Sequence, residues 1–287
     1  MRLKIIHETN YSFNKGVFLE PHYLRFQLRT TAYQTIESSE LVITPKPTGL
    51  SQQTDAESNL IHFAWFDGIT HALEILATTV IQTTPFNPFN FLVSPAEYLK
   101  TPFAYSSYHL SSLSACLEPT RIGQKLMRYG DKLLEQTKGH TVNFVIQLTR
   151  QIHNDFTIEE RLVGAPLDPD DTFNRKIGSC RDVSWMQIQL LRHVGIAARF
   201  VSGYYFIDEE ITDFELHGWV EVFLPGAGWI GLDPSHGILT GDHHLPICAS
   251  AHHKATMPVT GTTRGEATAD LRTQLQIKKL PTAPPAS

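Results

Sequence analysis

The chain has 287 residues, of which 41% are hydrophobic and 18% charged, a composition typical of a folded globular protein with a full core. Its formal net charge of −5 lacks the basic excess of nucleic-acid-binding proteins, so we expect no nucleic acid partner. No run of residues approaches the length of a transmembrane span, and the short, polar N-terminus is unlike a secretory signal peptide. We therefore expect no membrane partner and a cytoplasmic location.

The first hundred residues predict β-structure. Short runs with strand-like alternation are separated by glycine, proline and aspartate turn signals. We expect strands near residues 3–7, 23–28, 41–44, 62–66 and 72–82. This pattern is typical of an antiparallel β-sandwich, to which we assign residues 1–100. A crossing rich in proline and asparagine at 83–91 precedes the change to helical periodicity.

The rest of the chain predicts helices followed by strands, and hence an α+β fold. Apolar residues recur at helical spacing in 118–134 and 141–156, and a buried helix is expected from about residue 181 to residue 193. Strands are expected at 196–206, 216–224 and 229–233, and a proline- and glycine-rich hairpin turn joins the last two. We assign 101–260 to an α+β core in which this helix packs on an antiparallel sheet. Residues 261–287 are expected to form a C-terminal tail with a covering strand and then a disordered end.

Cys180 lies directly before the predicted buried helix, after a turn of small residues. The unpaired N–H groups and the positive end of the helix dipole at such a position stabilise a thiolate and lower the pKa of a cysteine. A buried and inert thiol is nevertheless the commoner role of a cysteine. The interpretation therefore depends on partners further along the chain.

His217 and Asp233 lie on neighbouring strands of the predicted hairpin. Counting back from the turn brings Asp233 opposite Trp219 or Val220, and only one of these registers puts it on the same face as His217. An imidazole can act as the base for a thiol, and a carboxylate can fix the tautomer of that imidazole and stabilise its cation. The order Cys180, His217, Asp233 therefore predicts a catalytic triad.

Three further residues are candidates for support of this site. Asp182 either anchors the loop before the cysteine or serves as an acidic residue in the first helical turn, which the dipole favours. Trp185 and Trp219 either line the cleft or pack in the core, and packing is the commoner role of tryptophan.

The other cysteines and histidines do not predict a metal site or a cofactor. The three cysteines are far apart, and this odd, sparse count is typical of a reducing compartment. The C-terminal part is rich in histidine, but adjacent histidines without a helical partner or a paired cysteine are a weak ligand pattern. These residues are Cys116, Cys248, His236, His243, His244, His252 and His253.

Three stretches carry a resemblance to a known family. They are Gly178-Ser-Cys-Arg-Asp-Val-Ser-Trp185, then Leu191 to Tyr204, then Asp213 to Pro234 with its Leu-His-Gly-Trp-Val-Glu-Val run. Together they resemble the bacterial transglutaminase-like family, within the transglutaminase-like cysteine peptidase superfamily. Residues 11–26, the 87–91 crossing and residues 102–105 resemble the N-terminal region that accompanies such cores.

The resemblance implies a papain-like core with Cys180, His217 and Asp233 as a thiol triad, and no cofactor. It implies acyl transfer on amide bonds, and we expect hydrolysis of a peptide or protein amide. Protein crosslinking or deamidation is the alternative reaction, and a peptide-binding module without catalysis is the alternative class. The expected partner is a peptide or protein substrate, with the oligomeric state left open.

Overall fold

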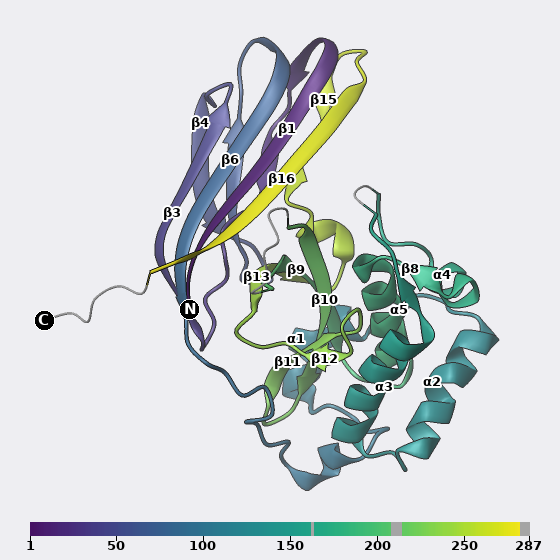
Figure 1. Ribbon diagram of the computed structural model, residues 1–287. Coiled ribbons are helices and arrows are strands. Elements are labelled where there is room, and N and C mark those ends of the chain that lie inside the picture. The colour runs from purple at the N-terminus through teal and green to yellow at the C-terminus, as the bar shows by residue number, and fades with distance from the viewer. Residues whose placement is uncertain (162–163, 208–213, 282–287) are drawn as a thin grey trace, which may run out of the picture.

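The computed structural model describes residues 1–161, 164–207 and 214–281 (Figure 1). A part built from long strands stands above a part in which helices pack beside a shorter sheet (Figure 1). This combination of helices and antiparallel sheet, with a strand-rich N-terminal region, confirms the predicted α+β class.

Two antiparallel sheets form the strand-rich part. One contains β1 (Arg2–Leu19), β3 (Gln34–Thr44), β6 (Ile69–Thr83), β15 (Thr263–Arg264) and β16 (Ala269–Leu280). The other contains β2 (His22–Leu24), β4 (Gly49–Thr54), β5 (Leu60–Trp65) and β14 (Val259–Thr260). Buried residues alternate along β1 and β6, as expected of strands with one face toward a core. Leu19, Leu24, Ala64 and Leu73 lie in the cluster between the two sheets.

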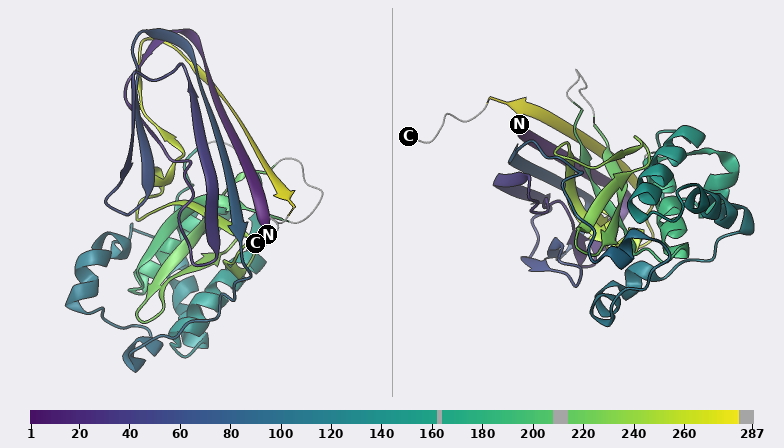
Figure 2. Two further views of the ribbon diagram at one scale, coloured as in Figure 1. Left: turned by 90° about the vertical axis from the view of Figure 1, so that its left-hand side faces the viewer. Right: turned by 90° about the horizontal axis from the view of Figure 1, so that it is seen from below.

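The C-terminal strand returns to the first sheet. β16 pairs antiparallel with β1, from Arg2 opposite Leu280 to Phe13 opposite Ala269, so the first and last strands of the chain are neighbours (Figure 2). Residues 261–281, expected to be a tail, thus contribute two strands to the sheet that begins the chain. The expected disordered end, 282–287, lies outside the described residues. The domain limits at residues 100 and 260 stay predictions.

The second part is a five-stranded antiparallel sheet with helices beside it. Its strand order is β12 (Ile238–Leu239), β11 (Gly228–Asp233), β10 (Leu216–Leu224), β9 (Ala198–Tyr205) and β13 (His244–Ser250). The helices are α1 (Ser107–Leu117), α2 (Gln124–Gln136), α3 (Thr141–Asp155), α4 (Pro169–Arg175) and α5 (Cys180–His193), with 3₁₀ helices η1 (Ala96–Leu99) and η2 (His253–Thr256). A short parallel pair, β7 (Thr157–Ile158) and β8 (Ile177–Gly178), precedes α5. Among the described residues, no helix combines the length and apolarity needed to cross a membrane.

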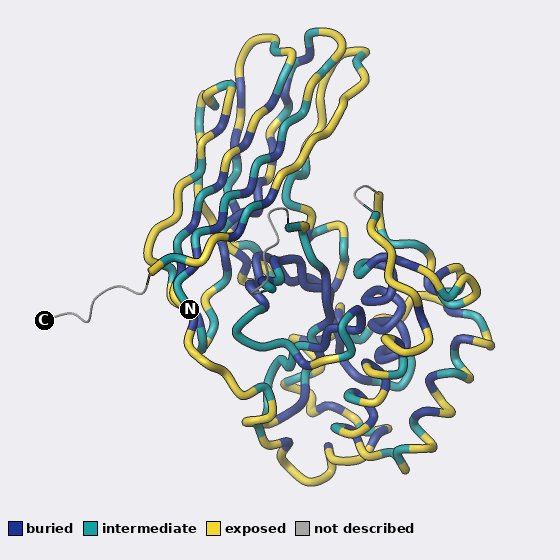
Figure 3. The backbone as a smooth tube through the Cα atoms, in the orientation of Figure 1, coloured by how far each residue is buried: buried dark blue, intermediate teal, exposed yellow. Residues whose placement is uncertain are grey.

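The cysteine helix α5 lies at the centre of this part and packs against β9 and β10. Its residues from Asp182 to Arg192 are all buried, and Figure 3 shows this burial along its backbone. A helix with apolar residues on most of its faces is stable only when other elements cover those faces. The sheet, α2, α3 and α4 cover α5 in this way.

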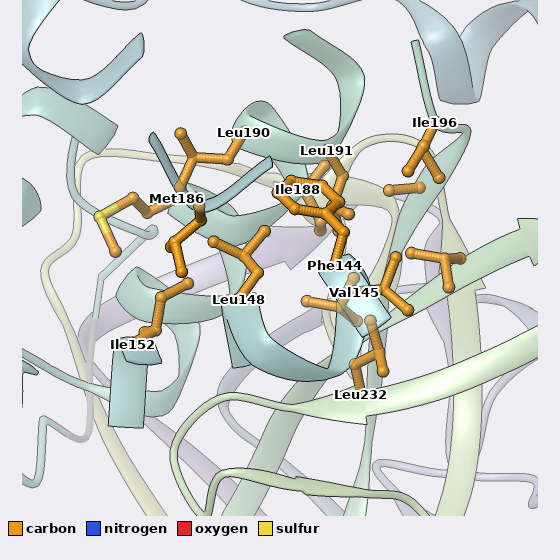
Figure 4. Packing of buried hydrophobic residues seen from close by; sticks show 14 of the residues in the cluster. Phe144, Val145, Leu148, Ile152, Met186, Ile188, Leu190, Leu191, Ile196 and Leu232 are labelled. Atoms are coloured by element: carbon orange, nitrogen blue, oxygen red, sulfur yellow. The ribbon is translucent and has the colours of Figure 1, made fainter. Parts of the chain in front are cut away.

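The largest core cluster is formed mainly where α3 and α5 meet the sheet (Figure 4). Leu148 of α3 and Leu190 of α5 are fully buried in it, as is Leu232 of β11. This packing fixes α5 relative to β11, and therefore fixes Cys180 relative to the strand that carries Asp233.

Two helices are among the differences between the expected and the observed elements. The helix expected at 118–134 begins only at Gln124, because Pro119 disfavours helical backbone before it and Gly123 adopts the extended conformation of an N-cap. The preceding helix α1 was not predicted, since it is rich in serine and buries only Leu113 and Cys116.

We predict that Leu148→Ala lowers the free energy of unfolding by about 2–5 kcal/mol, because it leaves a cavity between α3 and α5. Leu92→Ala makes the same chemical change at a side chain that is 74% exposed, and should change the free energy of unfolding by less than about 0.5 kcal/mol. Urea unfolding of both variants measures the two effects. Equal urea midpoints for the two variants would contradict the proposed importance of the packing between α3 and α5.

Candidate active site

Cys180 is the first residue of α5, and the turn before it is fixed by a buried carboxylate. Asp182 Oδ2 accepts hydrogen bonds from the Ser179 backbone N–H at 2.7 Å and from the Ser179 hydroxyl at 2.8 Å. Its Oδ1 accepts from the Leu167 N–H at 2.7 Å and from Arg161 at 2.6 Å. Burial alone would raise the pKa of Asp182, but these donors outweigh it and the pKa falls below its usual value. Asp182 is therefore both a first-turn acid and the anchor of the loop that leads to Cys180.

Cys180 is half-buried, and its thiol is in hydrogen-bonding contact with the His217 ring. Burial by itself would raise the pKa of Cys180, but the positive charge of His217 and the Gly218 N–H outweigh it and lower the pKa. The other two thiols behave in the opposite way, since burial raises the pKa of Cys116 and raises that of Cys248 to about 12. Cys180 is thus the cysteine whose surroundings favour the thiolate.

The hairpin has the register that places His217 and Asp233 on one face of the sheet. Val220 pairs with Leu232, which brings Asp233 level with Trp219, two residues from His217. The His217 Nε2 lies 2.8 Å from Asp233 Oδ2, and this leaves Nδ1 as the nitrogen for the Cys180 sulfur. Burial would lower the pKa of His217, but the charges of Asp233 and Cys180 raise it to about 10. At neutral pH the imidazole is therefore protonated.

The Asp233 carboxylate is fully buried and accepts hydrogen bonds at both oxygens. Oδ1 accepts from the Ser235 N–H at 3.0 Å, from the Ser235 hydroxyl at 2.6 Å and from the His236 N–H at 3.3 Å. Oδ2 accepts from three imidazoles, those of His217, His236 at 2.8 Å and His244 at 3.0 Å. Burial would raise the pKa of Asp233, but His217 and the other donors hold it well below the usual range.

His236 and His244 are two of the C-terminal histidines for which the sequence predicts no role. A signal for His236 was present, because it follows Asp233 by only three residues in the Asp-Pro-Ser-His turn. His244 gave no such signal, since it reaches Asp233 from β13 at the edge of the sheet.

The two tryptophans lie in different surroundings. Trp219 is 1% exposed, and its ring centroid is 5.9 Å from that of His217 and 5.3 Å from that of His244. Trp185 is buried within the main core cluster and packs edge-on against His253 at 4.8 Å. The structure thus brings Trp219, and not Trp185, against the histidines of the site.

Two family models match the chain. Residues 3–82 match the bacterial transglutaminase-like N-terminal region, and residues 129–234 match the transglutaminase-like superfamily. The second match contains Cys180, His217 and Asp233.

Individual proteins agree with these matches. The crystal structure of a candidate cysteine protease from Cytophaga hutchinsonii has the same fold, with a TM-score of 0.71 and 18% identity over 99% of this chain and 93% of that one. An uncharacterized protein of Mycobacterium tuberculosis is 22% identical over 280 residues, or 91% of this chain and 87% of the relative. A protein-glutamine gamma-glutamyltransferase of Pseudomonas aeruginosa is 29% identical over 93 residues, which are 29% of this chain and 14% of that protein. The chain therefore combines a bacterial transglutaminase-like N-terminal region with a core of the transglutaminase-like superfamily.

Proposed function

We propose that this protein is a thiol-dependent acyl-transfer enzyme that hydrolyses an amide bond of a peptide or protein substrate. The observation that carries the proposal is that His217 contacts both Cys180 and Asp233, with the His217–Asp233 hydrogen bond at 2.8 Å. A thiolate, an imidazolium and a carboxylate in this order are the groups that amide cleavage by a thiol requires.

The reaction begins with attack of the Cys180 thiolate on the amide carbonyl, which forms a carbon–sulfur bond and an oxyanion. The Cys180 backbone N–H at the start of α5 is one donor for that oxyanion. His217 gives a proton to the leaving nitrogen as the carbon–nitrogen bond breaks, and a thioester remains. Water then attacks the thioester while His217 takes its proton, and release of the carboxylic acid restores the thiolate.

The second candidate is transfer of the acyl group to an amine, as in protein crosslinking, with deamidation of glutamine as its hydrolytic counterpart. The 29% identity with the Pseudomonas protein-glutamine gamma-glutamyltransferase over 93 residues favours it. Both reactions pass through the same thioester and differ in whether water or an amine takes the acyl group. A peptide-binding module without catalysis would have no need of a thiolate paired with an imidazolium, which makes it the weakest of the three candidates.

Casein with methylated amino groups, incubated in parallel with and without dansylcadaverine, distinguishes these reactions. New primary amines on the casein in the incubation without the added amine indicate peptide hydrolysis, and incorporation of dansylcadaverine in the other indicates crosslinking activity. Release of ammonia without incorporation indicates deamidation. We expect new primary amines with the native protein.

We predict that Cys180→Ala and His217→Ala each lower the turnover rate by roughly 10⁴-fold or more, since they remove the nucleophile and its base. Asp233→Asn should cause a loss about a hundredfold smaller, because the amide still orients the imidazole without stabilising its cation. Cys116→Ala is the matched control and should retain activity. Turnover by Cys180→Ala at the native rate would refute the assignment.

A separate prediction concerns the reactivity of the thiols. Because the pKa of Cys180 is lowered while those of Cys116 and Cys248 are raised, iodoacetamide should alkylate Cys180 first at neutral pH. In Asp233→Asn the pKa of His217 falls, so the imidazolium that stabilises the thiolate is lost at a lower pH. Alkylation of Cys180 should then need a higher pH than in the native protein. Peptide mapping at several pH values measures this, and equal rates for the three native thiols would contradict the prediction.

A further inference from the structure

We propose that His244 and His236 are positioning residues that hold Asp233 Oδ2 against His217, and thereby keep the triad aligned. The inference rests on the proposed function. One oxygen of the Asp233 carboxylate accepts hydrogen bonds from three imidazoles, whereas a catalytic triad needs only one.

His244 is suited to act as a fixed, neutral donor. Its side chain is 1% exposed, and burial lowers its pKa below the usual value, which favours the uncharged ring. The Gly241 backbone N–H donates to His244 Nδ1 at 3.3 Å, which requires that Nδ1 carries a lone pair. The proton of the neutral ring is therefore on Nε2, where it is donated to Asp233 Oδ2 at 3.0 Å.

His236 approaches the same carboxylate from the turn after β11. Its backbone N–H donates to Asp233 Oδ1 and its Nδ1 donates to Oδ2, so this one residue contacts both oxygens. The His236 side chain is 37% exposed, in contrast to that of His244. The Tyr205 ring lies 4.5 Å from each of these two imidazoles, centroid to centroid, and packs against both.

The geometry shows what these contacts prevent. Asp233 is at the end of β11 and His244 at the start of β13, and the sheet order places β10 and β9 between these strands. The hydrogen bond from His244 therefore connects Asp233 Oδ2 to β13, the strand at the other edge of the sheet. The Ser235 N–H restrains the second oxygen, Oδ1. A carboxylate restrained at both oxygens cannot rotate away from His217.

A metal site is the other arrangement that such a cluster suggests, since ligand atoms of His217, Asp233 and His236 all lie within 4.8 Å of one another. Metal binding needs the lone pairs of the ring nitrogens. The ionised Asp233 carboxylate can only accept hydrogen bonds, so each ring nitrogen that contacts it must carry a proton. We therefore assign the cluster to hydrogen bonding.

Two pairs of variants test the proposal. His244→Leu removes the donor, whereas His244→Gln keeps an N–H near the position of Nε2. His236→Leu and His236→Asn make the same comparison at the position of Nδ1. His252→Leu is the control, because His252 is an exposed histidine of the same C-terminal part.

Two readouts separate positioning from general stability. In the methylated casein assay, each leucine variant should lower the rate at saturating substrate by about 10-fold or more, a loss typical of groups that orient a functional imidazole. The substrate concentration for half-maximal rate should change less than the rate does, and the glutamine and asparagine variants should recover most of the loss. In proton NMR, the downfield resonance of the His217 Nε2–H proton should move in the leucine variants and return in the amide variants.

Unchanged rates and an unchanged resonance in folded leucine variants would overturn the proposal, as would amide variants as impaired as the leucine ones. If His244→Leu fails to fold, the His236 pair decides the question, since that side chain is half-exposed. The NMR readout needs no substrate and tests positioning even if the proposed reaction is wrong. Failure of the reaction itself is recognised separately, by turnover that persists in Cys180→Ala.

Discussion

A buried carboxylate that water cannot reach must be stabilised by hydrogen bonds or by an opposite charge. Asp233 is such a carboxylate, and the groups of this site are arranged around it to supply that stabilisation. Its donors come from β10, from the turn after β11 and from β13. Because they come from different strands and from a turn, this end of the sheet must form before the carboxylate has all its hydrogen bonds. The ionised carboxylate keeps His217 protonated, and the imidazolium in turn lowers the pKa of Cys180 and so favours its thiolate.

A second buried carboxylate does the corresponding work for the cysteine. Asp182 fixes the turn at the start of α5, and the packing of α3 and α5 against the sheet fixes the helix itself. Asp182 thus positions the nucleophile Cys180, and Asp233 positions the base His217. Of these two carboxylates, Asp233 is the one that contacts His217. This division explains why a site that depends on short contacts can be assembled from a helix end and a strand end.

The parts that could be predicted from the sequence are those set by local patterns. The strand at Leu216–Leu224 was predicted with its observed bounds, because its alternation is regular and a proline–glycine turn ends it. That turn also limits the register to two choices, and the observed one is the choice that places Asp233 on the same face as His217. The parts that could not be predicted depend on distant contacts. β16 pairs with β1 across almost the full length of the chain, and His244 meets Asp233 only once β13 has joined β9.

The protonation state of His217 tests the central claim most directly, because thiolate, imidazolium and carboxylate depend on one another. Nitrogen NMR of the imidazole, recorded from pH 5 to 11 on the native protein, reports it without a substrate. With a pKa of about 10, both ring nitrogens should carry protons at pH 7, and the ring should lose one near pH 10. In Cys180→Ala the loss should occur at a lower pH, since the negative charge of the thiolate is gone. A ring that is neutral at pH 7 in the native protein would contradict the account.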